Sequence, residues 1–423
     1  MPFTATLRPL VALAGLALLA CSRPAAGPGT SLTPGLALVD VATGLSQPTD
    51  VAFLPDGRLV ITEKGGALRL RALDGTLSTA ATLPVDAASE KGLLGVAVPP
   101  AFAVDGRLVL YWSRAGSAGG SDLDRHRVSS FVLGGDGTLD LASEVVLVSG
   151  LRGPANHDGG ALAVGPDGWL YVGVGDTGCN SGLPPGPALT PSNYFATCLT
   201  NANGKILRVG LDGAVPADNP LATVEAATAC GAVCGAAPTT TGAPRREIWA
   251  WGFRNPWRMT FDPATGLLWV GDLGEVSFEE VTIARAGRHH GWPWREGANG
   301  WPVAKCREVV PDTGDCVDPA YQCRHGAAAG GVDGDCDAIT GGVFLPAPRW
   351  PAPLAGRYLF ADNDNGRVWT LDLTADRTGV VQGSRREVAR LGGSPVSLRI
   401  GPEGDAYVVL LAGTVARLTP AGP

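Results

Sequence analysis

The residues best suited to chemistry lie in three short stretches, and the first of them centres on a histidine. His157 stands between Asn156 and Asp158 and is followed by two glycines. The ordinary pKa of histidine suits proton transfer near neutral pH, and the glycines leave one face of the ring open to a ligand. A hydrogen-bonded loop histidine is the alternative. The stretch therefore makes His157 a candidate general base, but it does not decide between this role and that of a hydrogen-bonded loop residue.

The second stretch combines a guanidinium, an amide and tryptophans. Arg254 and Asn255 lie between Trp251 and Trp257. A guanidinium is a planar fork that suits a carboxylate, an amide both donates and accepts, and tryptophan faces can stack on a sugar or a flat cofactor. An arginine that caps carbonyls between structural units explains the same residues, so both interpretations stay open.

The third stretch, residues 271–280, holds glycine turns and carboxylates, which are hard oxygen ligands suited to calcium. Two other acidic tracts, 333–337 and 362–366, look like starts of calcium loops, but Phe344 and Leu373 occupy the places of the closing glutamates. These two tracts are better interpreted as polar turns. The neighbouring His289 and His290 point in different directions, which makes them a poor zinc site.

A repeated pattern predicts the elements that position these residues. The 60 glycines and 34 prolines make about 22% of the 423 residues, which favours short strands and turns over a helical bundle. An Asp-Gly-like turn between alternating apolar segments recurs six times, beginning near residues 48, 92, 159, 257, 354 and 396. Such turns are strong hairpin signals. We therefore expect an all-β, six-bladed propeller over residues 36–420, with a β-sandwich or solenoid as the alternative.

The N-terminus is typical of an export signal. Residues 1–21 contain Arg8, an apolar run from Leu10 to Ala20, and then Cys21. The last four of these residues also resemble a bacterial lipobox, in which Cys21 carries a lipid anchor; plain secretion is the alternative. Residues 22–35 are rich in Ala, Pro, Gly and Thr and predict a flexible tether. We expect an exported protein, periplasmic or attached to the outer membrane.

The remaining eight cysteines fall into three long inserted loops, residues 176–204, 213–246 and 295–340. Disulfides form in exported proteins, so four are expected, with pairing inside 179–234 and inside 306–336. A zinc site is the weaker alternative because the spacing lacks paired CxxC elements. We therefore expect inserted loops that are cross-linked (stapled) by disulfides. These loops would surround one mouth of the propeller's central channel, where the chemistry is expected.

The charge balance bears on partners. The formal net charge is −7, and no long basic run is present. A phosphate backbone is bound by clustered cations, so nucleic acid is not an expected partner.

Together the motifs resemble the soluble glucose/sorbosone dehydrogenases, which include PQQ-dependent aldose sugar dehydrogenases. The resemblance covers roughly residues 36–418, and its motifs occur in order: Gln47–Pro48, Glu90–Gly95, His157 with its glycines, Asn203–Arg208, Arg254–Pro256, Gly271–Asp272, Gly291–Pro293, Thr340–Gly342 and Gly356–Asp362. The family has a six-bladed propeller, which agrees with the repeat count.

The resemblance implies a mechanism and a set of ligands. His157 would remove the proton of a sugar's anomeric hydroxyl while the C1 hydride passes to PQQ. Arg254 and Asn255 would hold PQQ, with Glu90 nearby. Calcium would bind carbonyls at Gly274 and Glu275, and a second calcium would use Glu280 and backbone near His290. A sugar substrate and a quinone or cytochrome acceptor would be the partners.

Several positions depart from the family pattern. Glu90 replaces a glutamine and brings negative charge towards an anionic cofactor, while Asn156 replaces a carboxylate beside the histidine, which predicts a less well-tuned base. A fifth-blade lysine and two sixth-blade arginines are also missing, since Ser394 and Val396 stand near the latter. A non-catalytic propeller that binds carbohydrate or protein is therefore the alternative. A cation at the channel mouth from Lys305, Arg307 or Arg324 would favour the enzyme.

Overall fold

The computed structural model describes residues 29–115, 124–153, 156–178, 193–230 and 240–421. The predicted export signal, the lipid-bearing Cys21 and the first half of the tether lie outside these ranges, as do Cys179 and Cys234. No helix within the described ranges is long and apolar enough to cross a membrane.

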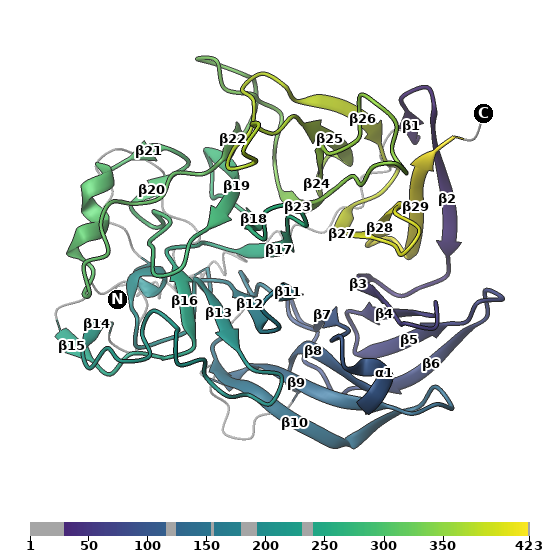
Figure 1. Cartoon of the computed structure of the whole chain (residues 1–423), viewed down its shortest axis with the longest axis horizontal. Coiled ribbons are helices and arrows are strands. Elements are labelled where there is room, and N and C mark those ends of the chain that lie inside the picture. The colour runs from purple at the N-terminus through teal and green to yellow at the C-terminus, as the bar shows by residue number, and fades with distance from the viewer. Residues whose placement is uncertain (1–28, 116–123, 154–155, 179–192, 231–239, 422–423) are drawn as a thin grey trace, which may run out of the picture.

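Six antiparallel sheets of four core strands form a closed ring, which confirms the predicted propeller (Figure 1). The inner strands of the six blades, in order, are β3 (Pro48–Phe53), β7 (Leu93–Ala97), β11 (Leu162–Val164), β17 (Pro256–Phe261), β23 (Ile339–Phe344) and β27 (Pro395–Ile400).

The other strands follow outwards from the centre in each sheet. They are β4 (Leu59–Glu63), β5 (Ala67–Arg71) and β6 (Leu77–Thr82) in blade 1; β8 (Arg107–Ser113), β9 (His126–Leu133) and β10 (Leu139–Leu151) in blade 2; β12 (Leu170–Val174), β13 (Lys205–Val209) and β16 (Ile248–Trp251) in blade 3; β18 (Leu268–Asp272), β19 (Phe278–Ala284) and β22 (Tyr321–Arg324) in blade 4; β24 (Tyr358–Asp362), β25 (Arg367–Leu371) and β26 (Arg386–Arg390) in blade 5; and β28 (Ala406–Leu410), β29 (Thr414–Pro420) and β2 (Leu36–Ala42) in blade 6.

Short elements occupy the connections. They are α1 (Phe102–Asp105), η2 (Phe195–Thr197), η3 (Val303–Glu308), the pair β14 (Ala227–Ala229) and β15 (Thr240–Gly242), and the pair β20 (Arg295–Glu296) and β21 (Asn299–Gly300).

The N-terminal strands close the ring. β2 pairs with β29, so that the outermost strand of blade 6 comes from the opposite end of the chain. β1 (Ser31–Leu32) pairs with β26 and adds a fifth strand to blade 5. The predicted tether therefore extends too far, because residues 31–32 find backbone partners in a folded sheet.

A separate apolar core fills each gap between neighbouring blades. Leu68 and Leu108 belong to the core between blades 1 and 2, for example, and Trp269 and Tyr358 to the core between blades 4 and 5. Inner strands are buried over much of their length because sheets cover both of their faces. Burial on both faces explains why β7 reads as a continuous apolar run.

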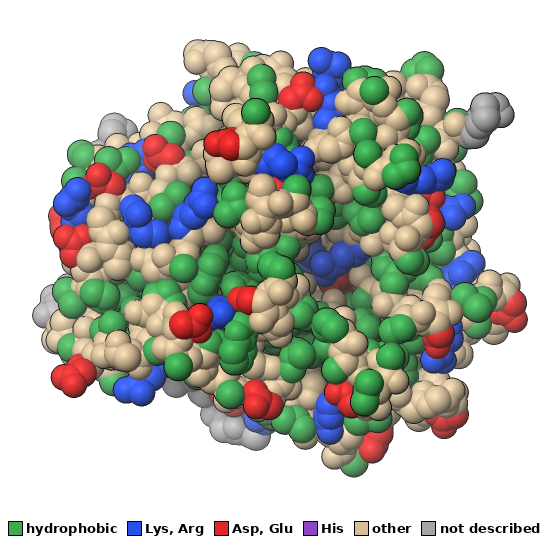
Figure 2. Space-filling model, in the orientation of Figure 1, with side chains coloured by type: hydrophobic (Ala, Val, Ile, Leu, Met, Phe, Trp, Pro, Cys, Tyr) green, Lys and Arg blue, Asp and Glu red, His purple; other side chains and the backbone are tan. Residues whose placement is uncertain are grey.

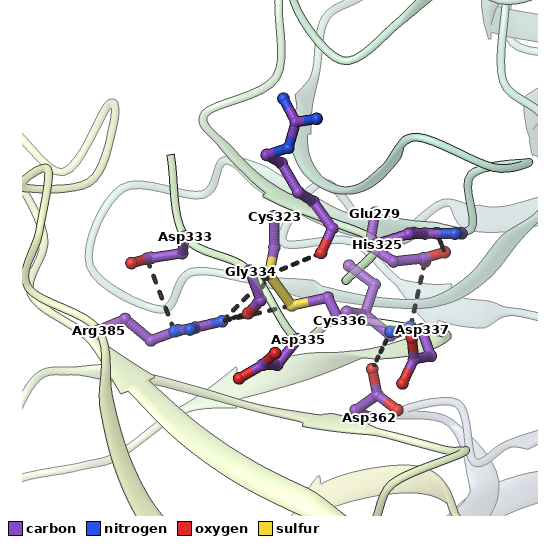
Figure 3. Close-up of a disulfide and its surroundings, with 12 residues drawn as sticks. Glu279, Cys323, His325, Asp333, Gly334, Asp335, Cys336, Asp337, Asp362 and Arg385 are labelled. Carbon is purple, nitrogen blue, oxygen red and sulfur yellow. Dashed lines mark hydrogen bonds and ion pairs between the residues drawn. A yellow bond between two sulfur atoms is a disulfide. The ribbon is translucent and has the colours of Figure 1, made fainter. Parts of the chain in front are cut away.

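The inserted loops are cross-linked as predicted. Disulfides join Cys198 to Cys230, Cys306 to Cys316 and Cys323 to Cys336, each inside one of the two expected clusters. The zinc alternative is wrong for these six cysteines, because their sulfurs are already bonded. In Figure 3, Arg385 approaches the Cys323–Cys336 disulfide, and its Nη1 lies 3.0 Å from the Cys323 sulfur.

One stretch assigned to a loop proves to be the outer strand of a blade. Residues 321–324, inside the predicted loop 295–340, form β22 and pair with β19. Blade 4 thus recruits its outer strand after a long excursion, which brings residues 285–320 over the neighbouring blade, where Trp294 and Cys306 join the core that contains Tyr194 and Leu199.

The centre of the ring is hollowed, with basic side chains inside the hollow (Figure 2). A cavity of about 420 Å³ is lined by the C-terminal halves of the inner strands, including residues 51–53, 96–98 and 162–164, with Arg399. His157 precedes β11, whereas Leu162–Val164 line the cavity. The cavity therefore opens at the end of the channel opposite His157.

Candidate active site

A histidine–aspartate pair lies at one mouth of the channel. His157 Nδ1 is 2.6 Å from Asp176 Oδ1, and both side chains are buried. Burial alone would raise the pKa of Asp176, but the charge and hydrogen bond of His157, together with Arg254, outweigh burial and hold this pKa below its ordinary value. Because Asp176 Oδ1 accepts the hydrogen bond from His157 Nδ1, Nε2 is the ring nitrogen left to accept a proton.

This pair corrects one expectation. Replacement of a carboxylate by Asn156 suggested a less well-tuned base, yet the structure supplies a carboxylate from Asp176, two residues after the end of β12. The chain turns back towards His157 after this strand, so the partner is 19 residues away in sequence and in direct contact in space.

The loop that carries His157 is held in a strained conformation. The φ angle of His157 is +54°, a region that side chains other than glycine rarely adopt. Glu90 Oε2 accepts the His157 backbone N–H at 2.7 Å, and Asn255 Oδ1 accepts the N–H of Gly159 at 3.1 Å. A Cβ on Gly175 would lie only 1.8 Å from the His157 carbonyl oxygen, so glycine is required there.

Glu90 lies against the loop that carries His157. Its carboxylate faces the backbone of His157, and Lys64 contributes a positive charge beside it. Burial raises the pKa of Glu90, while His157 opposes this rise. The negative charge that seemed to oppose an anionic cofactor is therefore compensated by backbone amides and a lysine.

Arg254 and Asn255 lie on a turn organised by Asp272. The carboxylate of Asp272 accepts the backbone N–H of Arg254 at 3.1 Å and that of Asn255 at 2.7 Å. The guanidinium of Arg254 donates to the carbonyls of Leu273, at 3.2 Å, and Gly274. Its buried Nε has no hydrogen-bond partner among the described residues. An orphaned guanidinium N–H fits a site for an anionic ligand group such as a carboxylate.

Carboxylates gather beside this turn. Asp272 on β18 is the register partner of Glu280 on β19, and Glu275 and Glu296 are close by. Burial raises the pKa of Asp272 to about 7, and burial together with Asp272 raises the pKa of Glu280 well above its ordinary range. Grouped, desolvated carboxylates with nearby carbonyls form a donor set that fits a divalent hard cation.

Glu296, one of these carboxylates, holds the loop that follows β18. Glu296 Oε1 accepts the backbone N–H groups of four consecutive residues, 275–278, at 2.7 to 3.1 Å. This contact fixes the path of the loop after β18, and with it the carbonyl of Gly274. The predicted calcium ligands Gly274, Glu275 and Glu280 therefore lie within one compact region next to Arg254.

The three inserted-loop cations named above have local contacts in the structure. Lys305 pairs with Glu308 and lies 4.6 Å from the Trp301 ring centroid. Arg307 pairs with Asp315 at 2.9 Å, and Arg324 lies over the Phe278 ring. Lys305 and Arg307 are thus paired within their own loop, whereas Arg324 packs against Phe278, which directly follows the loop 275–277 of the candidate site.

Two site residues, Asp176 and Trp292, received no role from the sequence, and Asp272 was noted only among possible calcium ligands. Asp176 follows β12 and Asp272 ends β18, each directly after a glycine, which is a detectable signal for a carboxylate at a strand end. Nothing in the sequence indicated that Trp292 contacts Asp176, because the two residues come from different blades.

Comparison with known proteins identifies the family of this chain. The family model described as Glucose / Sorbosone dehydrogenase matches residues 45–334. Aldose sugar dehydrogenase YliI of Escherichia coli is 26% identical over 374 residues, which cover 86% of this chain and 87% of that protein.

Solved structures share the whole fold. A Thermus thermophilus protein described as a putative oxidoreductase (glucose dehydrogenase) has a TM-score of 0.69 and 26% identity, over 91% of this chain and all of its own. The PQQ-bound form of aldose sugar dehydrogenase from Streptomyces coelicolor has a TM-score of 0.63 and 22% identity, over 92% of this chain and 99% of its own, and it bears on the fold alone. The protein is a six-bladed propeller of the oxidoreductase type. It belongs to the glucose/sorbosone dehydrogenase family.

Proposed function

We propose that the protein is a PQQ- and calcium-dependent dehydrogenase that oxidises the anomeric hydroxyl of an aldose sugar. The observation that carries the proposal is the buried His157–Asp176 pair beside Arg254 and a carboxylate cluster. A general base, an arginine suited to an anion and carboxylates suited to a cation then lie around one mouth of the channel. Family membership and the aldose-dehydrogenase relative support the same chemistry.

Each residue then has a distinct task. His157 Nε2 takes the proton of the C1 hydroxyl, and Asp176 stabilises the resulting imidazolium through Nδ1–H. Bound PQQ would supply a quinone that accepts the C1 hydride, so that two electrons leave the sugar and a lactone forms. Arg254 would pair with a carboxylate of the cofactor, Asn255 keeps the His157 loop in place, and Gly274 with Glu275 would hold calcium.

Cellular context completes the proposal. An N-terminal signal with a lipid on Cys21 would place the enzyme in the periplasm or on the outer membrane, where a quinone or cytochrome would reoxidise it. The cysteines that pair as three disulfides support an oxidising compartment.

The test is titration calorimetry of PQQ into metal-stripped residues 22–423, with and without calcium, followed by dye reduction with a panel of aldoses. Calcium-dependent binding of micromolar or tighter affinity and sugar-driven dye reduction would support the dehydrogenase. Absence of binding at every calcium concentration would favour a non-catalytic propeller that binds carbohydrate or protein, which the uncharged Ser394 and Val396 already suggest as the alternative.

Calcium is also expected to stabilise the protein without PQQ. A ligand present at 100 times its Kd adds about 2.7 kcal/mol to the free energy of unfolding, because only the folded chain assembles the site. Glu280→Gln should remove the part of this gain that comes from the calcium bound at Glu280, with little effect on the metal-free protein, since burial already favours the protonated, glutamine-like form of Glu280.

Thermal unfolding with and without calcium measures this effect. Glu308→Gln is the matched control, because Glu308 is exposed and lies in the inserted loop away from the carboxylate cluster. An equal calcium-induced rise in Tm in Glu280→Gln and in the parent protein would remove Glu280 from the metal site.

A further inference from the structure

Trp292 contacts two functional groups of the site at once. Its indole Nε1 donates to Asp176 Oδ2 at 2.7 Å, and its ring lies 5.6 Å from the guanidinium carbon of Arg254. Its backbone N–H donates to the carbonyl of Gly252 at 3.0 Å, two residues before Arg254. The side chain is 7% exposed, so these contacts are shielded from water.

We propose that Trp292 is a positioning residue that sets the proton affinity of the His157–Asp176 pair and couples this pair to Arg254. For catalysis the proposal rests on the function proposed above. The contacts themselves need neither cofactor nor sugar, so the proposal can be tested on the unloaded protein.

The hydrogen bonds of Asp176 show why the indole matters. Oδ1 accepts from His157 Nδ1 at 2.6 Å and from the backbone N–H of Gly178 at 2.8 Å, while Oδ2 accepts from Trp292. A donor to a buried carboxylate stabilises its negative charge. Loss of that donor leaves the charge less stabilised, and the pair then binds a proton more tightly, whichever of the two side chains carries it.

The surrounding charges define the background for this effect. The charged groups come from five segments of the chain around the pair. They are Arg254, Asp272, Glu275, Lys205 and Glu90. Trp292→Phe replaces none of these five residues.

The ring of Trp292 performs the coupling. A guanidinium within about 6 Å of an aromatic centroid is attracted to the ring face. The same side chain thus fixes the anion-binding group and the partner of the base, although the three residues come from separate segments: Asp176 from blade 3, Arg254 from the turn before blade 4 and Trp292 from the insertion after β19.

Trp292→Phe isolates the indole N–H, because phenylalanine keeps an aromatic ring. The readout is an NMR titration of the His157 ring in the unloaded full chain, with His157 assigned among the five histidines by the spectrum of His157→Asn. We expect the titration midpoint to rise by about one unit, a tenfold gain in proton affinity, as loss of one hydrogen bond to a charged group implies.

Trp294→Phe is the matched control. Trp294 lies two residues away, is equally buried, and has an indole Nε1 without a hydrogen-bond partner among the described residues. Its replacement should leave the His157 midpoint unchanged. An unchanged midpoint in a folded Trp292→Phe variant would overturn the proposal.

A second measurement needs no variant at position 292. In the parent protein the indole proton of Trp292 should shift with the same midpoint as the His157 ring, since both contact Asp176. An indole signal that ignores this titration would also overturn the proposal. In the loaded Trp292→Phe enzyme, the midpoint of the acid limb of the kcat/KM profile should rise by the same one pH unit. If PQQ does not bind, the proposed function fails, while the NMR result still decides the role of Trp292.

Discussion

His157→Asn is expected to lower sugar-driven dye reduction roughly 100- to 10,000-fold while PQQ and calcium binding persist. The range is that of a positioned general base, because asparagine cannot accept the substrate proton at neutral pH. Asparagine is the appropriate replacement since it tolerates a φ of +54° better than other residues and its amide can still donate to Asp176. An alanine variant would mix loss of the base with loss of loop geometry.

Steady-state rates with saturating PQQ and calcium would show the effect. Asp56→Asn serves as the control, because Asp56 is 51% exposed, pairs with Arg58 at the surface and should leave the rate unchanged. A His157→Asn enzyme within tenfold of the parent rate would exclude His157 as the base and leave the site without a described proton acceptor in this position.

The second large effect concerns stability rather than chemistry. Asp50 lies buried in the centre of the ring, where Oδ2 accepts from Arg399 Nη2 at 2.6 Å and Oδ1 accepts from Ser397 Oγ at 2.7 Å. It also compensates Arg258, whose pKa burial lowers to about 10 and Asp50 raises. These contacts join blade 1 to blades 6 and 4.

Asp50→Asn should therefore cost about 3–5 kcal/mol of unfolding free energy, because it leaves two guanidinium groups in the ring without their carboxylate. Denaturant unfolding followed by tryptophan fluorescence measures the loss. Asp56→Asn is the control, since Asp56 is 51% exposed and pairs with Arg58 at the surface, where ion pairs contribute at most about 1 kcal/mol. A loss below about 1 kcal/mol in Asp50→Asn would show that the central pair does not stabilise the ring.

The repeats illustrate how far the sequence alone led. Five of the six turn motifs lie between the first and second strands of their blades, so the blade count followed directly. The fifth motif, beginning at residue 354, falls on β24 and β25 instead, because a longer connection, residues 345–357, separates them from the inner strand β23. Local hairpin chemistry predicts that strands pair, but not which strand faces the channel.

The long insertion of blade 4 shows what the local sequence pattern did not predict. Residues 321–324 lack a neighbouring hairpin signal, and they become a strand only because β19 offers an unpaired edge. Similarly, Leu32 was assigned to a tether but pairs with Ala389, more than 350 residues away. Backbone pairing at such separation depends on the assembled ring, which no local pattern reports.

By itself, the sequence determined the all-β propeller, the clustering of the disulfides, and the nomination of His157, Arg254 and Asn255, since turn chemistry, cysteine spacing and residue type are local properties. Tertiary structure alone decided that Asp176 partners His157, that Glu90 supports its backbone, and that Trp292 joins the pair to Arg254. These contacts arise where loops of different blades meet, and their pKa effects depend on burial and on neighbouring charges that exist only once the ring has closed.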